Sequence, residues 1–356
     1  MTLPEISHIR LVNQQLVGTD FKTPEQIVSW MGAMQAQDYA MSKWAVGVRL
    51  PNSTDKLIQE ALDKGAIIRT HVLRPTWHLV SADDIYWMLE LSGPRVKAFI
   101  QPRIKFLEIT EQLFSKSNAI IEKALSANNH STREEIIAKL NEANIITDDL
   151  RGLHFLMRAE LEGLICSGIT RNKNQTYALL SERVAKTASL NKDEALAKLA
   201  KKYFLSHGPA TLADFTWWSG LSASEAKHAL EMIKSDLVSD TIEKQTFWMN
   251  NSVSTFDDKR STYLLPAFDE FLISYKDRSA SIPLHHQSRA FTNNGIFKPV
   301  IVENGQVTGI WKRTIQKDKV IIETDYFKPQ NEASKKQVQK AAGRFGKFLN
   351  KQITFL

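Results

Sequence analysis

The same order of predicted elements, two helices followed by a β-hairpin, occurs three times along the chain, and this order constrains the fold most strongly. In the first occurrence, the predicted short helix "TPEQIVSWMGAMQ" begins at Thr23 with Pro24 next and Gln26 in the capping-box position. The second helix, "STDKLIQEALDKG", begins at a Ser/Thr cap and ends at Gly65. The following "AIIRTHVLRPTWHLV" has β-branched residues on both sides of a proline-containing turn, which predicts a hairpin.

The order returns in residues 131–182 and again in residues 193–250. In the first of these, "STREEIIAKLNEANI" carries a Ser131/Glu134 capping box and "LRGLHFLMRAELEGLI" is an amphipathic helix, after which "CSGITRNKNQTYALL" supplies two strands. In the second, helical segments precede two strands that end in "KQTFWMN". Two helices and a hairpin are typical of the winged-helix arrangement.

From Thr255 onward the sequence indicates short strands, a hairpin turn in "NGQVTG" and a basic terminal helix. A chain of 356 residues is too long for one ordinary core, which agrees with several compact units. We therefore predict an α+β protein of three tandem winged-helix units and a small β-rich C-terminal domain. The predicted boundaries are 1–130, 131–192, 193–254 and 255–356.

Charge and cysteine content narrow the class of partner and the compartment. The 46 Lys and Arg residues outnumber the 39 Asp and Glu residues, and the resulting net charge of +7 favours a polyanionic partner. Cys166 is the only cysteine, which excludes an intrachain disulfide and a cysteine-built zinc site. The N-terminus lacks a signal-peptide pattern and no apolar run is long enough for a membrane span. We expect a cytoplasmic monomer without a membrane anchor, metal or cofactor.

The stretch "MGAMQAQDYA" places Gln35 and Gln37 one residue apart. In a continuing α-helix these side chains would point about 200° apart, whereas in extended backbone they share one face. The helix that starts at Pro24 is therefore predicted to end at or just before Gln35, with both glutamines on one concave surface. From spacing alone, such a pair is most often two solvent-exposed side chains without a function.

Four ordered motifs resemble the AlkZ/YcaQ-type winged-helix DNA glycosylase family, in the branch that carries a Gln-x-Gln motif. They are "MQAQDYAMSKWAVGVRL", "IIRTHVLRPTWHLVSADD", "SHGPATLADFTWWSGL" and "LLPAFDEFLISYKDRS", and the resemblance covers nearly the whole chain. It implies tandem winged helices with a small β-barrel, a basic concave channel for duplex DNA, and hydrolysis of N-glycosidic bonds to alkylated bases. It also implies that Gln35 and Gln37 are the catalytic pair.

The implied reaction needs no general acid, because an N7-alkylated purine is already cationic and leaves as a neutral base. What remains is to place a water beneath C1′ and to stabilise an oxocarbenium-like sugar. A glutamine carbonyl can accept a hydrogen bond from that water, and its amide can donate to a phosphate or base. Asp38 is the alternative base, but in extended backbone it points away from the glutamines and ranks lower.

Basic side chains supply the predicted DNA contacts. Arg69, His71 and Arg74 lie on the first predicted hairpin, and Lys227 lies in the third winged-helix unit. These residues could reach phosphates or enter a groove, although exposed basic residues on a hairpin are usually only solvated. The duplex with alkylated bases is the expected partner.

Other polar residues are given structural roles. His78 is expected to make a hydrogen bond in the core or between elements, because no acidic or histidine residue lies at metal-ligand spacing around it. The adjacent His285 and His286 also lack such spacing. Asp269 and Arg278 are expected to form a structural pair or cap in the C-terminal domain.

We expect a monofunctional glycosylase, since no lysine is placed for Schiff-base lyase chemistry. The alternative is a non-catalytic winged-helix transcriptional regulator that reads sequence with the same units. This alternative is weakened because the sequence offers neither an effector domain nor a dimerisation helix.

Overall fold

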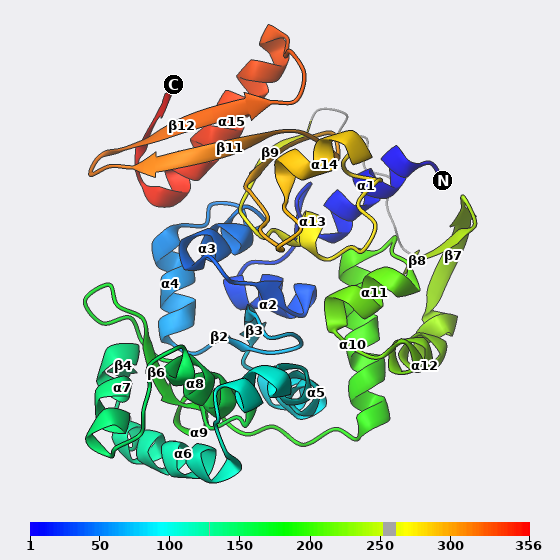
Figure 1. The fold of residues 1–356 in the computed structure, drawn as a ribbon. Helices are drawn as coiled ribbons and strands as arrows, with labels where there is room; N and C mark the ends of the chain where they lie inside the picture. The colour runs from blue at the N-terminus through cyan, green and yellow to red at the C-terminus, as the bar shows by residue number, and fades with distance from the viewer. Residues whose placement is uncertain (128, 252–260) are drawn as a thin grey trace. The chain divides into compact units, whose positions relative to one another are not determined.

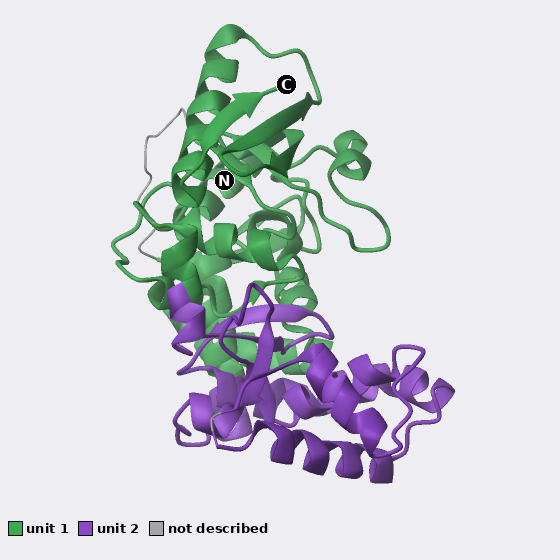
Figure 2. Ribbon diagram, turned by 90° about the vertical axis from the view of Figure 1, so that its left-hand side faces the viewer, with its two compact units in different colours: residues 1–59, 196–356 green, residues 60–195 purple. Residues whose placement is uncertain are grey.

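The computed structural model describes residues 1–127, 129–251 and 261–356 of the chain (Figure 1). The chain divides into two compact units, which are coloured separately in Figure 2. Unit 1 consists of Met1–Gln59 and Leu196–Leu356, and unit 2 consists of Glu60–Ala195. Unit 1 thus contains both ends of the chain. The finer division into three winged-helix units and a C-terminal domain remains a prediction.

Unit 1 contains most of the helices and a five-stranded sheet. Its helices are α1 (Leu3–Asn13), α2 (Pro24–Met31), α3 (Tyr39–Gly47), α11 (Leu212–Ser219), α12 (Ala223–Ile233), α13 (Glu270–Ile273), α14 (Leu284–Ala290) and α15 (Glu332–Leu349). Its strands are β1 (Met34–Gln35), β7 (Leu237–Ile242), β8 (Gln245–Asn250), β9 (Thr262–Leu265), β10 (Val300–Glu303), β11 (Gln306–Ile315), β12 (Lys319–Tyr326) and β13 (Gln352–Phe355). Helices α4 (Asp55–Asp63) and α10 (Lys192–His207) cross the division between the units.

The C-terminal sheet of unit 1 has the strand order β13-β12-β11-β10-β9 and curls into a half-barrel (Figure 1). The predicted hairpin turn joins β10 to β11 at Asn304 and Gly305, whose φ angles of 50° and 80° require residues that tolerate left-handed backbone. Helix α15 packs against this sheet. Leu11 of α1 and Leu16, which follows that helix, belong to a core that residues of β9, β10 and β11 also form. Residues near the start of the chain therefore share a core with the C-terminal sheet.

Unit 2 has a second hydrophobic core, which is formed by helices and short antiparallel strands. Its helices are α5 (Ile85–Phe106), α6 (Glu111–Leu125), α7 (Arg133–Glu142), α8 (Arg151–Leu161) and α9 (Leu180–Arg183). Its strands are β2 (Ile67–His71), β3 (Trp77–Ser81), β4 (Ser131–Thr132), β5 (Ile165–Ser167) and β6 (Thr176–Leu179). The predicted hairpin is present as β2 and β3, which pair antiparallel.

The predicted element order recurs in the structure, with one shift at a helix start. Helices α7 and α8 are followed by the β5–β6 pair, and α10, α11 and α12 are followed by the β7–β8 pair. The capping box of α7 is formed by Thr132 and Glu135, so the predicted Ser131/Glu134 box is wrong by one residue. The reason is that Ser131 pairs with Tyr177 in the β4–β6 ladder, which delays the start of the helix.

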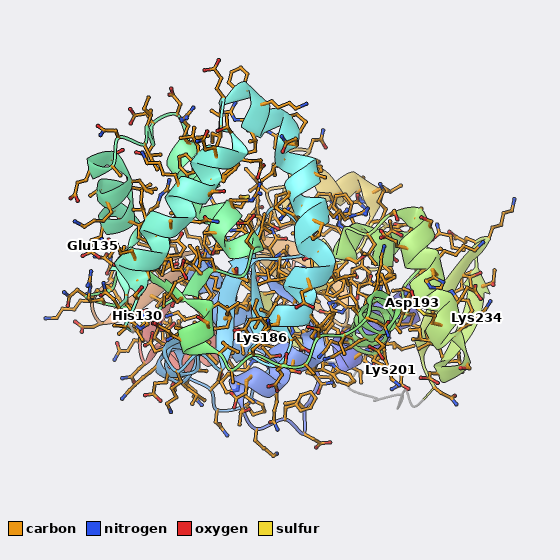
Figure 3. All side chains as sticks on the ribbon, turned by 90° about the horizontal axis from the view of Figure 1, so that it is seen from below. His130, Glu135, Lys186, Asp193, Lys201 and Lys234 are labelled. Carbon is orange, nitrogen blue, oxygen red and sulfur yellow. The ribbon has the colours of Figure 1, made fainter. Side chains whose placement is uncertain are left out.

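Two lysines of α10 have different surroundings. Lys201, labelled in Figure 3, is exposed. Its ammonium forms an ion pair of 2.9 Å with Asp236. Lys202 is half-buried, and its ammonium donates to the Ser29 carbonyl at 2.7 Å.

None of the helices described here is long and apolar enough to cross a membrane.

Candidate active site

The Gln-x-Gln motif follows the end of α2, as predicted. Helix α2 stops at Met31, and Gly32 has a φ of +77°, a left-handed conformation that glycine adopts without strain. Gln35 ends the short strand β1 and is only 6% exposed, whereas Gln37 lies two residues later and is exposed. The backbone at the motif is thus non-helical, while the placement of both amides on one water remains a prediction.

Asp38 has a structural role directly after the motif. It is the N-cap of α3, and its Oδ1 accepts a hydrogen bond of 3.0 Å from the Met41 amide. Its Oδ2 lies 3.6 Å from the guanidinium of Arg313 on β11. Both contacts compete with proton abstraction from a water, which supports the lower rank given to Asp38 as a base.

A buried carboxylate contacts the backbone of the motif. The backbone N–H of Gln35 donates a hydrogen bond to Glu270 Oε1 at 2.6 Å, and both residues belong to unit 1. Glu270 Oε2 accepts from the Trp218 indole N–H at 3.2 Å and from the Ser274 hydroxyl. His207 Nε2 lies 3.6 Å from the same oxygen. These contacts join three distant segments of unit 1 around one side chain.

The charge of this carboxylate is set by its hydrogen bonds. Burial alone would raise the pKa of Glu270, but His207, the Ser274 hydroxyl and the Gln35 amide outweigh it and lower the pKa to about 2. Burial lowers the pKa of the His207 imidazole. At neutral pH, Glu270 is therefore a buried carboxylate held by donors.

Asp269, the neighbour of Glu270, supports α13. It caps the helix by accepting from the Phe271 amide at 2.9 Å, which confirms the predicted cap. Its ion-pair partner is Arg49, whose two guanidinium nitrogens lie 2.8 and 2.9 Å from the two carboxylate oxygens. The guanidinium of Arg278 lies 4.9 Å from the ring centre of Phe291.

The predicted DNA-binding residues of β2 lie in unit 2, and two of them have little exposed surface. Arg69 is 8% exposed, stacks 4.1 Å from the ring centre of Trp77 and donates to Gln175 at 2.7 Å. His71 is 3% exposed, and its Nδ1 lies 2.5 Å from Glu160 Oε2. Both side chains thus have structural contacts, and their contact with DNA remains a prediction.

The other candidates differ in their exposure. Arg74 is half-buried in the loop after β2, and its guanidinium lies 3.5 Å from the His78 ring. His78 is fully buried and its Nδ1 lies 2.9 Å from the Thr76 carbonyl, which confirms the predicted core hydrogen bond. Lys227 is exposed on α12 in unit 1, beside a pocket of about 490 Å³ that Lys276 also lines. Lys227 is therefore the candidate best placed to meet a phosphate.

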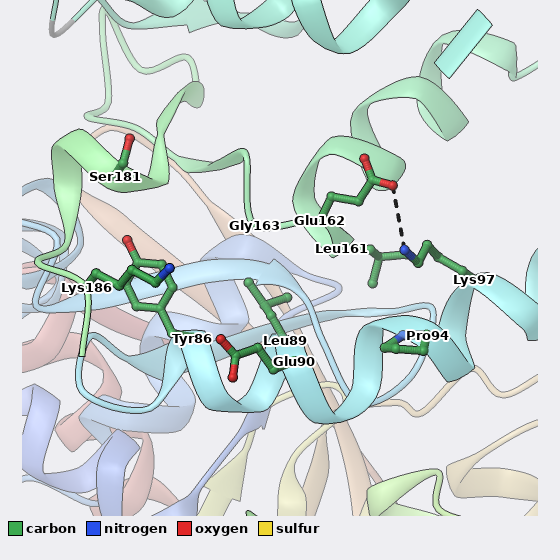
Figure 4. A pocket seen from close by; sticks show the side chains of 10 residues that line it. All are labelled: Tyr86, Leu89, Glu90, Pro94, Lys97, Leu161, Glu162, Gly163, Ser181 and Lys186. Carbon is green, nitrogen blue, oxygen red and sulfur yellow. Dashed lines mark ion pairs between the residues drawn. The ribbon is translucent and has the colours of Figure 1, made fainter. Parts of the chain in front are cut away.

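A second pocket, of about 470 Å³, lies within unit 2 (Figure 4). Leu89 and Leu161 line it, and Lys97 and Glu162, which also line it, form an ion pair of 3.6 Å. It contains none of the predicted site residues. Within the described ranges, no group of three or more His, Cys, Asp or Glu side chains could hold a metal ion.

Glu270, His207 and Trp218 are the site residues that sequence reasoning missed. All three lie in motifs that carried the resemblance, "SHGPATLADFTWWSGL" and "LLPAFDEFLISYKDRS". A carboxylate within an apolar motif was the available signal, because a buried charge needs partners. The sequence did not indicate that the partner would be Gln35.

The chain is similar to known proteins over most of its length. The family model described as DNA glycosylase AlkZ-like matches residues 28–348, which include the glutamine motif and Glu270. A curated relative, the interstrand DNA cross-link repair glycosylase of Streptomyces sahachiroi, is 23% identical over 331 residues, which cover 85% of each chain. The solved structure of Streptomyces sahachiroi DNA glycosylase AlkZ has a TM-score of 0.82 at 18% identity and matches over the full length of both chains. The chain belongs to the AlkZ-like DNA glycosylase family.

Proposed function

We propose that this chain excises cationic N7- and N3-alkylpurines from duplex DNA by hydrolysing the N-glycosidic bond, with the water positioned by Gln35 and Gln37. The observation that carries the proposal is the placement of the Gln-x-Gln motif at the end of β1, with its first residue anchored and its second exposed. A glutamine whose backbone is held in place, with an exposed glutamine two residues later, can present side-chain oxygens that hold a water against an incoming sugar.

The lesion must supply what the motif lacks. Amides do not protonate a leaving base at neutral pH, and Asp38 is engaged at the cap of α3. A base that already carries positive charge needs no such proton. We therefore expect excision of N7-methylguanine and of a bulkier N7 adduct, and no excision of uracil or 8-oxoguanine. Single-turnover excision from matched duplexes tests this, and efficient uracil release would show that an acid has been overlooked.

The roles of the two glutamines are tested by substitution. Gln35→Ala and Gln37→Ala should each lower the single-turnover rate by roughly tenfold to a thousandfold, the range expected for loss of one preorganised polar contact. DNA affinity should stay near wild type. Equal losses of rate and affinity would make the glutamines DNA anchors only.

Asp38→Asn is the matched control for a hidden base. Asparagine keeps a side-chain oxygen that can cap α3 but cannot accept a proton from water. We expect a rate within about threefold of wild type, because the proposed mechanism gives the charge of Asp38 no part in the hydrolysis. A loss as large as that of Gln37→Ala would instead assign Asp38 as the base.

Binding to DNA should follow from charge. With a net charge of +7, affinity for duplex should fall steeply with salt and depend little on sequence, because phosphate contacts dominate. Sequence-selective binding that resists salt would favour the regulator, an alternative that the family membership already disfavours. We propose Arg69, His71, Arg74 and Lys227 as contributors, with Lys227 first because it is exposed.

The name of the curated relative extends the substrate test. That protein is described as an interstrand DNA cross-link repair glycosylase. We include a duplex cross-linked through two N7-alkylated guanines as a substrate, since each linkage is cationic and meets the same chemical requirement.

A further inference from the structure

A single buried acid side chain links the proposed water site to the rest of unit 1. Glu270 is 1% exposed and lies 235 residues from Gln35 in the sequence. Its Oε1 nevertheless accepts a hydrogen bond of 2.6 Å from the backbone N–H of Gln35. A hydrogen bond to a charged acceptor is shorter and about twice as strong as one between neutral groups. The backbone of Gln35 is thus held by a charged acceptor from a segment far along the chain.

The carboxylate is itself immobilised from the opposite side. Oε2 receives the Trp218 indole at 3.2 Å and the Ser274 hydroxyl, and the His207 ring lies beside it. The His207 ring stacks on Tyr203 with an interplanar angle of 12° and a centroid distance of 4.9 Å. Because each partner is packed in the core, Glu270 has little freedom to move.

The turn before the motif rests on the same cluster. At Gly32, a Cβ would lie 3.4 Å from the Trp218 ring and 3.5 Å from the Lys202 side chain, in addition to the strain of a positive φ. Trp218 therefore borders the backbone of residue 32 and also donates to the acid that holds residue 35. The two ends of the segment from Gly32 to Gln35 are held by one cluster.

We propose that Glu270 is a positioning residue of the glycosylase, which sets the place of the Gln35 side chain by holding its backbone amide. This inference rests on the proposed role of Gln35. A displacement of about 1 Å at a reacting centre can lower the rate by about a hundredfold. Glu270 can therefore affect the rate without contacting the substrate.

A double-mutant cycle tests the proposal in the full-length chain. Glu270→Gln keeps the shape of the side chain and removes its charge, and it should lower the single-turnover excision rate of N7-methylguanine by about a hundredfold with DNA affinity unchanged. In the Gln35→Ala background the same substitution should cost less than about threefold, because the side chain that Glu270 positions is already absent. Equal losses in both backgrounds, or a wild-type rate for Glu270→Gln, would overturn the proposal.

Two further variants guard against a folding defect. Asp214→Asn alters another buried carboxylate of unit 1, which holds the Lys276 amide at 2.8 Å and the Thr211 amide at 2.9 Å. It should lower thermal stability and leave the rate within about twofold of wild type; a rate loss matching that of Glu270→Gln would refute a specific role for Glu270. If Glu270→Gln does not fold, Trp218→Phe removes one donor to the acid and keeps an aromatic ring. Its rate loss must again vanish in the Gln35→Ala background.

The cycle also separates this inference from the proposed function. If Gln35→Ala retains the wild-type rate, the proposed role of Gln35 is wrong, and the Glu270 proposal falls with it. If Gln35→Ala is slow and Glu270→Gln is not, only the positioning role is refuted.

Discussion

Each unit contains a fully buried glutamate beside a histidine, and the two glutamates differ in their hydrogen bonds. In unit 1, Glu270 receives hydrogen-bond donors at both oxygens, and His207 together with the Ser274 hydroxyl and the Gln35 backbone N–H lowers its pKa to about 2. In unit 2, Glu160 meets His71 at 2.5 Å through Oε2, but Oε1 has no hydrogen-bond partner among the described residues, and burial raises its pKa. A histidine lies beside both acids, but only Glu270 also receives hydrogen-bond donors at both oxygens, and this difference favours its carboxylate form.

This difference has a functional meaning. A carboxylate with all its hydrogen bonds made is a rigid anchor, and Glu270 holds the backbone of the proposed catalytic motif. Glu160 instead carries an uncompensated oxygen in the core of its unit, which costs free energy in the folded state. The following experiments compare the two sites.

The largest effect is expected from removing each acid. Glu270→Ala leaves the Gln35 amide, the Trp218 indole and the Ser274 hydroxyl without their acceptor, and should cost about 3–5 kcal/mol of unfolding free energy. Glu160→Ala deprives only His71 of a close partner and should cost about 1–3 kcal/mol. Urea denaturation followed by circular dichroism measures both, and equal costs would contradict the comparison.

Acid titration should separate the two sites by sign. The folded pKa of Glu270 is about 2 and its ordinary value is 4.5, so its stabilisation is complete above pH 4.5 and is lost as the pH falls toward 2. The loss amounts to about 3 kcal/mol. Glu270→Gln should therefore lose less stability than wild type when the pH is lowered from 6 to 3. Parallel pH profiles would show that Glu270 has an ordinary pKa.

Glu160 should behave in the opposite way. Its folded pKa is raised, so its contribution is complete below its ordinary pKa of 4.5 and is lost as the pH rises through the folded value. Glu160→Gln carries no charge at any pH. Between pH 5 and pH 8, the melting temperature of this variant should therefore rise relative to that of wild type. A difference that is independent of pH would mean that Glu160 is not protonated in the fold.

The smallest effect is expected at an exposed pair, which calibrates the others. Lys201 and Asp236 lie 2.9 Å apart, but both side chains are about half exposed. Lys201→Ala should change the melting temperature by less than about 2 °C, because water and salt screen such pairs. A larger change would indicate that stability in this chain depends on its surface charges, and would weaken conclusions drawn from the buried acids.

Local patterns predicted the elements and the family of this chain. The capping signal at Thr23 and Gln26, the turn at Asn304 and Gly305 and the hairpin after Gly65 were all found, because each depends on contacts within a few residues. The end of α2 before Gln35 was predicted for the same reason. Four motifs were sufficient to identify the family that the comparisons confirm.

Burial and long-range partners were decided only by the tertiary structure. Arg69 and His71 were predicted to be DNA contacts, yet they are almost fully buried, because alternation along a strand does not show what covers each face. The contact of Glu270 with Gln35 spans 235 residues, and no local pattern encodes such a pair. The sequence by itself determined where helices, turns and the glutamine motif lie, since these follow from short-range sterics and hydrogen bonds. Which charge anchors that motif depends on packing that brings distant segments together.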